Sequence, residues 1–243
     1  MPRTGLGFPR SRWGSAGVAG GVGVAAFVLY LATLAPTITT AYASADSGEL
    51  VATASVLGIA HPPGYGLYLI LARGALTLLA FLPEPALRTN VLSAVCGAGA
   101  AGLTTLAADR LVDGARWTSA AIAGVAIAAS PLLWEQSIVT EVYALHAALT
   151  ALVLWGALVA LGGGTLWPVA IGIAGLAMHH PTGWALAAVV IVVVAIERGA
   201  RPALILGGAF LVGWVGAVAY LIARADAPIA WGDTHELPGA IRM

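Results

Sequence analysis

The sequence contains no lysine and one cysteine, and only 9% of its 243 residues are charged. Its eleven basic residues are therefore all arginines, and eleven acids balance them, so the chain has no basic surface for nucleic acid. The thiol of Cys96 has no second cysteine to pair with, which excludes an internal disulfide and a cysteine-based metal site. We predict no nucleic-acid binding and a packing role for Cys96.

Hydrophobic residues make up 60% of the chain, and its mean hydropathy is +0.92. A helix needs about 20 apolar residues to cross the hydrocarbon core of a bilayer. Eight segments are candidates: 16–36, 64–82, 90–108, 118–134, 142–161, 166–179, 183–197 and 203–223. Abundant alanine and glycine let membrane helices approach closely. We predict an all-α, polytopic integral membrane protein in the lipid bilayer, folded as a single domain over residues 1–243.

The first apolar segment has two interpretations. The arginines before it and the small residues after it resemble a signal peptide with its cleavage site; they are Arg3, Arg10, Arg12, Ala41-Tyr42-Ala43 and Ala43-Ser44-Ala45. The apolar run is longer than the usual signal-peptide core of about 7 to 15 residues. This length favours an uncleaved span.

The arginines also distinguish two membrane layouts, because they are enriched in cytoplasmic loops. If all eight segments cross, the loops after the third and seventh segments fall outside with Arg110, Arg116, Arg198 and Arg201. If segment 64–82 instead dips in and returns, these arginines join the N-terminal ones in the cytoplasm. Prolines at both ends of that segment favour a re-entrant or interfacial segment. We therefore predict about seven spans, a cytoplasmic N-terminus and a polar outer face.

A polar island follows the first segment: Asp46-Ser47-Gly48-Glu49, and then His61-Pro62-Pro63-Gly64-Tyr65. The spacing of Asp46 and Glu49 matches a capping box, in which both side chains bond the start of a helix. The seven-span layout supports another interpretation, because it brings His61, Glu141 and other ionisable residues to the same outer face. Such groups at membrane depth tend to face a cavity or a partner. Both interpretations stay open for Asp46.

Six motifs, in order along the chain, resemble bacterial membrane proteins related to the eukaryotic transmembrane O-mannosyltransferase of plexin and Met-type receptors, a branch of the GT-C glycosyltransferases. The motifs are Asp46-Ser47-Gly48-Glu49, His61-Pro62-Pro63-Gly64-Tyr65-Gly66-Leu67-Tyr68, Arg88-Thr89-Asn90-Val91-Leu92-Ser93-Ala94, Glu141-Val142-Tyr143-Ala144-Leu145, His179-His180 and Trp231-Gly232-Asp233. The resemblance runs from about residue 25 to residue 234.

The resemblance implies a transferase of the bacterial inner membrane with its active site on the extracytoplasmic face. It would move a sugar, mannose in the family, from a polyprenyl-phosphate donor to a hydroxyl of a protein or glycan, with inversion. Asp46 would be the base, because an acceptor hydroxyl is a weak nucleophile until a carboxylate takes its proton. The resemblance also implies catalytic roles for Glu49 and Glu141. The expected donor-phosphate ligands are His61, Arg88, His179 and His180. Residues expected to bind the acceptor or to support the site are Tyr65, Tyr143, Trp231 and Asp233.

Asp46 and Glu141 together would also form a hard oxygen site suited to Mg²⁺ or Mn²⁺, so the question of a metal stays open. Relatives in the family continue beyond the last motif with further spans, and we expect this chain to be the N-terminal catalytic module. The alternatives are a transporter or lipid-binding membrane protein with an outer polar cavity, and a non-catalytic subunit. A transporter predicts paired broken helices in two halves, a pattern that the sequence does not show.

Overall fold

The computed structural model describes residues 13–38, 45–112 and 117–243, which form helices and no strand. Four helices are long and apolar enough to cross a membrane: α1 (Trp13–Ala32), α4 (Pro85–Leu111), α7 (Tyr143–Leu161) and α10 (Ala200–Ala223). α5 (Trp117–Ala128) and α6 (Pro131–Ser137) are bent by 63° at a short break and together make a fifth candidate. The break falls at a proline, which cannot donate to the preceding turn.

The predicted all-α class of membrane protein is therefore confirmed for the described residues, but the predicted seven spans are not. Two apolar helices are shorter than the four long ones: α8 (Trp167–His179) has 13 residues and α9 (Thr182–Arg198) has 17. At 1.5 Å per residue, each falls short of the roughly 30 Å of hydrocarbon. The cleavage-like residues 41–44 and the arginines at 3, 10 and 12 lie outside the described residues.

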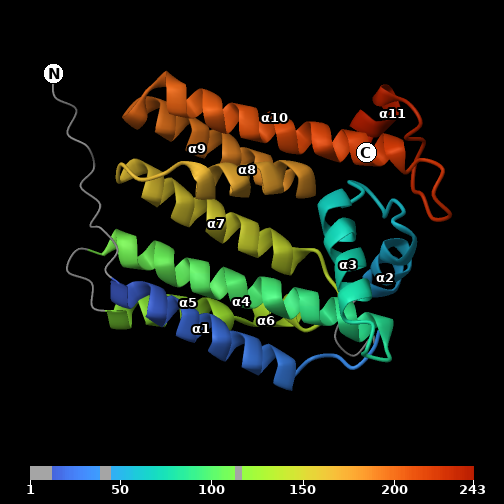
Figure 1. Ribbon diagram of the computed structural model, residues 1–243, viewed down its shortest axis with the longest axis horizontal. Coiled ribbons are helices and arrows are strands. Elements are labelled where there is room, and N and C mark those ends of the chain that lie inside the picture. Colours follow the sequence, from blue (N-terminus) through green and yellow to red (C-terminus); the bar gives the residue numbers. More distant parts are fainter. Residues whose placement is uncertain (1–12, 39–44, 113–116) are drawn as a thin grey trace.

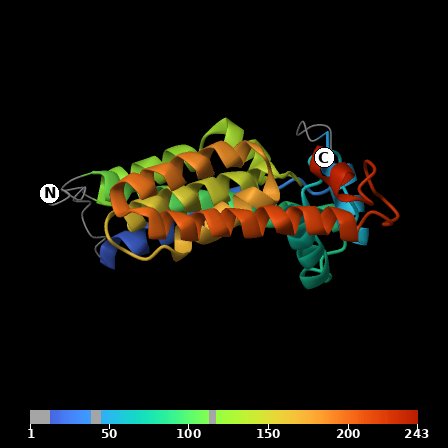
Figure 2. The same ribbon diagram turned by 90° about the horizontal axis from the view of Figure 1, so that it is seen from above.

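The long helices lie side by side in a bundle (Figures 1 and 2). α4 contacts α1, α5 and α7, and α8 contacts both α7 and α10. Small residues allow this packing: a Cβ added at Gly156 would lie 2.4 Å from the nitrogen of Val169, and one at Gly213 would lie 2.1 Å from the oxygen of Ala174. The close approach predicted from the alanine and glycine content is thus present where α8 meets its neighbours.

Three short helices gather at one end of the bundle: α2 (Ser47–Val56), α3 (Gly66–Leu78) and α11 (Leu237–Arg242) (Figures 1 and 2). α3 runs across the direction of the long helices, which suits the predicted re-entrant or interfacial segment. The end of α4 and the junction of α9 with α10 lie at the opposite end, and these carry Arg110, Arg198 and Arg201. The bundle is therefore polarised, with these arginines far from α2.

α10 and the segment after it hold the chain between α2 and His61. The guanidinium of Arg224 donates to the carbonyl oxygens of Val56 (2.9 Å) and Leu57 (2.6 Å), where α2 ends. Ile59 then pairs with residues 229–231 in a short parallel bridge: its N–H donates to the oxygen of Ile229 (2.9 Å), and its oxygen accepts from the N–H of Trp231 (3.1 Å). A motif near the C-terminus thereby fixes the approach of the chain to His61.

Candidate functional site

The predicted capping box is not formed. Asp46 occupies the N-cap position of α2, but its side chain makes no hydrogen bond to the helix, and Glu49 bonds His61 instead of reaching back. The reason lies in the backbone: Asp46 has φ −96° and ψ −9°, whereas a capping residue has the extended geometry that aims its side chain at the first turn. The carboxylate of Asp46 is therefore directed away from the helix.

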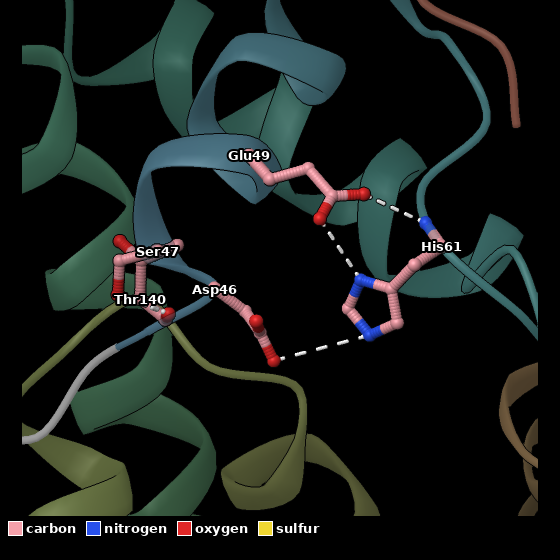
Figure 3. A network of polar contacts seen from close by, with 5 residues as sticks. All are labelled: Asp46, Ser47, Glu49, His61 and Thr140. Carbon is pink, nitrogen blue, oxygen red and sulfur yellow. Dashed lines mark hydrogen bonds and ion pairs between the residues drawn. The ribbon is translucent and has the colours of Figure 1, made fainter.

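Asp46, Glu49 and His61 form one polar cluster (Figure 3). The two oxygens of Glu49 accept from the backbone N–H of His61 (2.7 Å) and from its ring Nδ1 (3.0 Å). The other ring nitrogen, Nε2, lies 3.9 Å from Oδ2 of Asp46, which is beyond hydrogen-bond distance but within range of an ionic interaction. The imidazole thus has a carboxylate on each side.

Tyr65 lies between this cluster and a group of histidines. Its ring meets His61 edge-on at 5.2 Å between centroids and stacks on His180 at 5.7 Å. Its backbone adopts the left-handed conformation (φ 48°), which strains a bulky residue by about 1 to 3 kcal/mol. Burial, and after it the nearby Tyr143, raise the pKa of Tyr65 to about 12, so its phenol remains a hydrogen-bond donor. The strained turn is the feature that directs this ring into the site.

A polar face of α4 holds the segment before α7. Thr140 donates to Oδ1 of Asn90 (2.6 Å), and the amide of Asn90 donates to the oxygen of Ala35 (2.8 Å). The oxygen of Thr140 accepts from the hydroxyl of Ser47 at the start of α2 (2.6 Å; Figure 3). These bonds join α1, α2, α4 and the 138–142 segment, and the Asn90 motif therefore positions the site instead of binding a ligand.

This network brings Glu141 to Asp46. Glu141 is 6% exposed, and the backbone of Val142 and that of Asp46 lie near enough to its carboxylate to favour the charged form. Burial, and after it the charge of Asp46, raise the pKa of Glu141 from 4.5 to about 7. A carboxyl group with a pKa near neutrality can both hold and release a proton at the working pH. The predicted convergence of Asp46 and Glu141 is therefore present in the structure.

The raised pKa of Glu141 predicts that the protein becomes less stable as the pH rises. The folded protein holds this proton more tightly than the unfolded chain, so the contribution is fully present below pH 4.5 and is lost as the pH rises through about 7. Allowing for solvent screening, we expect the wild type to lose on the order of 2 kcal/mol relative to Glu141→Gln across this range. Thermal unfolding in detergent between these pH values measures it. The exposed control Glu135→Gln should follow the wild type, and parallel curves for wild type and Glu141→Gln would refute the prediction.

The two histidines at the end of α8, His179 and His180, have different surroundings. His179 is 2% exposed, and its Nε2 donates to the oxygen of Val142 (3.1 Å), which leaves Nδ1 as an acceptor with no partner among the described residues. Nδ1 of His180 accepts from the N–H of Thr182 (3.1 Å), so its Nε2 carries the hydrogen. Burial lowers the pKa of His180. Of these two histidines, His180 alone has an N–H without a partner among the described residues, and this N–H could meet a phosphate oxygen.

Two other predicted phosphate ligands, Arg88 and His61, also make contacts with other groups of the protein. The guanidinium of Arg88 donates to the carbonyl oxygens of Leu76 (3.1 Å), Ala80 (3.2 Å) and Leu82 (2.6 and 2.9 Å), which secures the end of α3. His61 lies between two carboxylates, which repel a phosphate. Arg88 and His61 stay predicted phosphate ligands, but carbonyl oxygens accept four hydrogen bonds from the guanidinium of Arg88, and the imidazole of His61 lies between two carboxylates.

The remaining predicted residues, Tyr143, Trp231 and Asp233, are exposed and form no hydrogen bond or ion pair with Asp46, Glu49 or His61. Tyr143 is 52% exposed and lies near Tyr65. Trp231 is 51% exposed and contributes the backbone bond to Ile59, whereas the side chain of Asp233 is exposed. Sequence reasoning did not assign a role to His146, whose ring lies 5.8 Å from that of His179. The available signal was a histidine about one helical turn after Glu141 in an otherwise apolar segment.

The group best placed to hold a metal differs from the predicted pair. Asp46, Glu49 and His61 offer ligand atoms within 4.8 Å of one another, and Glu141 is not part of this set. In the structure the hydrogen bond between Glu49 and His61 already occupies two of these groups. A cation would have to compete with that bond.

These features define a helical membrane protein with an acid and imidazole site at one end of its bundle. Residues 46–161 match the family model described as the N-terminal domain of the protein O-mannosyl-transferase TMEM260. The chain is 40% identical over 134 residues to the mouse (Mus musculus) protein named "Protein O-mannosyl-transferase TMEM260". No solved structure is significantly similar to the chain.

The match with the family model covers the acid cluster and not the whole chain. It includes Asp46, Glu49, His61 and Glu141, whereas the histidine pair at the end of α8 and the Trp231 motif lie beyond it. The aligned part makes up 55% of this chain and 18% of the mouse protein. The aligned part therefore spans less than a fifth of that relative's length. The similarity supports the predicted resemblance to O-mannosyltransferases over this segment.

Proposed function

We propose that this chain is the catalytic N-terminal part of a GT-C-type glycosyltransferase in a bacterial inner membrane. It transfers a sugar, with mannose the first candidate, from a polyprenyl phosphate to a hydroxyl group of a protein or glycan on the extracytoplasmic face. The observation that carries the proposal is the contact between Glu141 and the backbone of Asp46, inside the segment that is similar to an O-mannosyl-transferase. Two carboxyl groups with different surroundings suit acid–base chemistry.

In the proposed reaction, Asp46 removes the proton of the acceptor hydroxyl as its oxygen attacks the anomeric carbon. The bond from that carbon to the phosphate oxygen breaks, and its electron pair leaves with the lipid phosphate, which inverts the configuration. The N–H of His180 and the hydroxyl of Tyr65 supply donors for the phosphate. Glu141, with a pKa of about 7, orients the acceptor through its second oxygen. The proposed proton transfer involves no metal ion.

The direct test is a transfer assay. Membranes containing the protein are supplied with radiolabelled polyprenyl phosphomannose and a serine- and threonine-rich acceptor peptide. We expect label in the peptide, inverted at the anomeric carbon, and we expect transfer to continue in EDTA. Transport of the intact lipid without transfer would favour the competing transporter class. A loss in EDTA that Mn²⁺ restores would show that a metal takes part.

The proposed orientation predicts which helix ends react with an impermeant thiol reagent. In a Cys96→Ser background, a cysteine at the exposed Tyr143 should be labelled from outside intact cells. A cysteine at the exposed Leu111, at the opposite end of α4, should be labelled only after the membrane is opened. The reverse pattern would place the site on the cytoplasmic face.

A further inference from the structure

The contacts of Glu49 determine which nitrogen of His61 carries a hydrogen. One oxygen of Glu49 accepts from the backbone N–H of His61 at 2.7 Å, and the other lies 3.0 Å from Nδ1. A carboxylate can only accept, so Nδ1 of a neutral imidazole must be the donor and Nε2 must hold the lone pair. The same contact fixes both the backbone and the ring, which leaves the imidazole one orientation.

The lone pair of Nε2 is directed at Asp46. Oδ2 of Asp46 lies 3.9 Å away, and the side chain of Asp46 is 45% exposed. A movement of this carboxylate by about 1 Å would bring the two groups into hydrogen-bond contact. In general an imidazole holds a proton more tightly than a carboxylate. The ring of His61 also lies between the carboxylates of Asp46 and Glu49.

We infer that Glu49 is a positioning residue and that His61 receives the proton that Asp46 takes from the acceptor. This inference rests on the proposed function. After the acceptor oxygen has bonded to the sugar and the lipid phosphate has left, the carboxyl O–H bond of Asp46 breaks and the proton moves to Nε2 of His61. Asp46 becomes a carboxylate again, and the imidazolium later releases the proton to water. His61 is thus part of the proton path and not a ligand of the donor phosphate.

Two variants separate this role from a structural one. In Glu49→Gln, one amide oxygen can still accept from the backbone of His61, but the amide N–H₂ then faces Nδ1. Nδ1 must then accept from this amide with its lone pair, so the hydrogen lies on Nε2. A protonated Nε2 cannot receive the proton of Asp46, and the proton path is blocked. In His61→Asn, the amide reaches the position of Nδ1 and keeps the bond to Glu49, but nothing replaces Nε2.

The experiment combines NMR of ¹⁵N-histidine-labelled protein at alkaline pH with the transfer assay. We expect His61 to carry its hydrogen on Nδ1 in the wild type and on Nε2 in Glu49→Gln, with His61→Asn identifying the resonances by their loss. Both variants should lower kcat by about 10²-fold with little change in KM for the donor. Thermal unfolding should stay near that of the wild type. The matched controls Glu135→Gln and His235→Asn, at exposed residues outside the cluster, should change neither kcat nor the tautomer of His61.

Each other outcome has a definite meaning. A wild-type His61 with hydrogen on Nε2, or a tautomer that Glu49→Gln leaves unchanged, overturns the inference whatever the activity. A switched tautomer with wild-type kcat in both variants overturns the proton path. If the wild type transfers no sugar while the tautomer switches as expected, the proposed function has failed and the proton path with it, but the positioning of His61 by Glu49 stands.

Discussion

Replacing Asp46 with asparagine is expected to reduce sugar transfer by about 10²- to 10⁴-fold, the usual contribution of a general base. Asparagine has nearly the same shape but cannot take the acceptor proton. The side chain of Asp46 makes no capping bond to α2, and its backbone, which lies near the carboxylate of Glu141, is unchanged by the substitution. We therefore expect the loss to appear in kcat while the unfolding temperature stays the same.

The matched control is Asp226→Asn. Asp226 is also an exposed aspartate near a histidine, 3.8 Å from His235, but it lies outside the cluster. It should transfer sugar at the wild-type rate. If Asp46→Asn also kept its activity in the radiolabel assay, Asp46 would not be the base. The pKa of Glu141 gives an independent readout, because removing the charge of Asp46 should lower it from about 7.

Replacing Gly58 with alanine is expected to lower both stability and activity, although this residue touches no substrate. A Cβ at Gly58 would lie 2.1 Å from the carbonyl oxygen of Ile229, so the bridge between Ile59 and the 229–231 segment must open. Overpacking of this kind costs about 1 to 3 kcal/mol. The displaced backbone leads directly to His61, and a shift of about 1 Å in a catalytic group can reduce the rate by about 10²-fold.

Gly74→Ala controls for the loss of a glycine as such. Gly74 lies within α3, and an added Cβ there meets nothing within 4 Å. Its stability should equal that of the wild type or exceed it by up to about 1 kcal/mol, since alanine favours a helix. The measurements are thermal unfolding in detergent and the transfer assay. An unchanged unfolding temperature and rate for Gly58→Ala would show that the bridge does not position His61.

The polar island shows which features can be predicted from the local sequence and which cannot. The spacing of Asp46 and Glu49 predicted a capping box, and it correctly placed the start of a helix at Ser47. It could not predict the partner of Glu49, because His61 returns to α2 only through a turn that residues 224–231 hold in place. Arg88 is a similar case: its charge suggested a phosphate ligand, but carbonyl oxygens at the end of α3 occupy its guanidinium.

By itself, the sequence determined that this protein is helical and rich in long apolar segments, and it predicted that Asp46 and Glu141 lie on the same face, away from Arg110 and Arg198. Hydrophobic content, charge distribution and the order of the motifs can be read directly from the sequence. They reflect the membrane around the chain and the neighbouring residues along it. Only the tertiary structure decided the number of long helices, the absence of the capping bonds of Asp46 and Glu49, and the pairing of Glu49 with His61. A buried or half-buried polar side chain bonds whatever partner the fold brings within about 3 Å, and that partner is often distant in sequence.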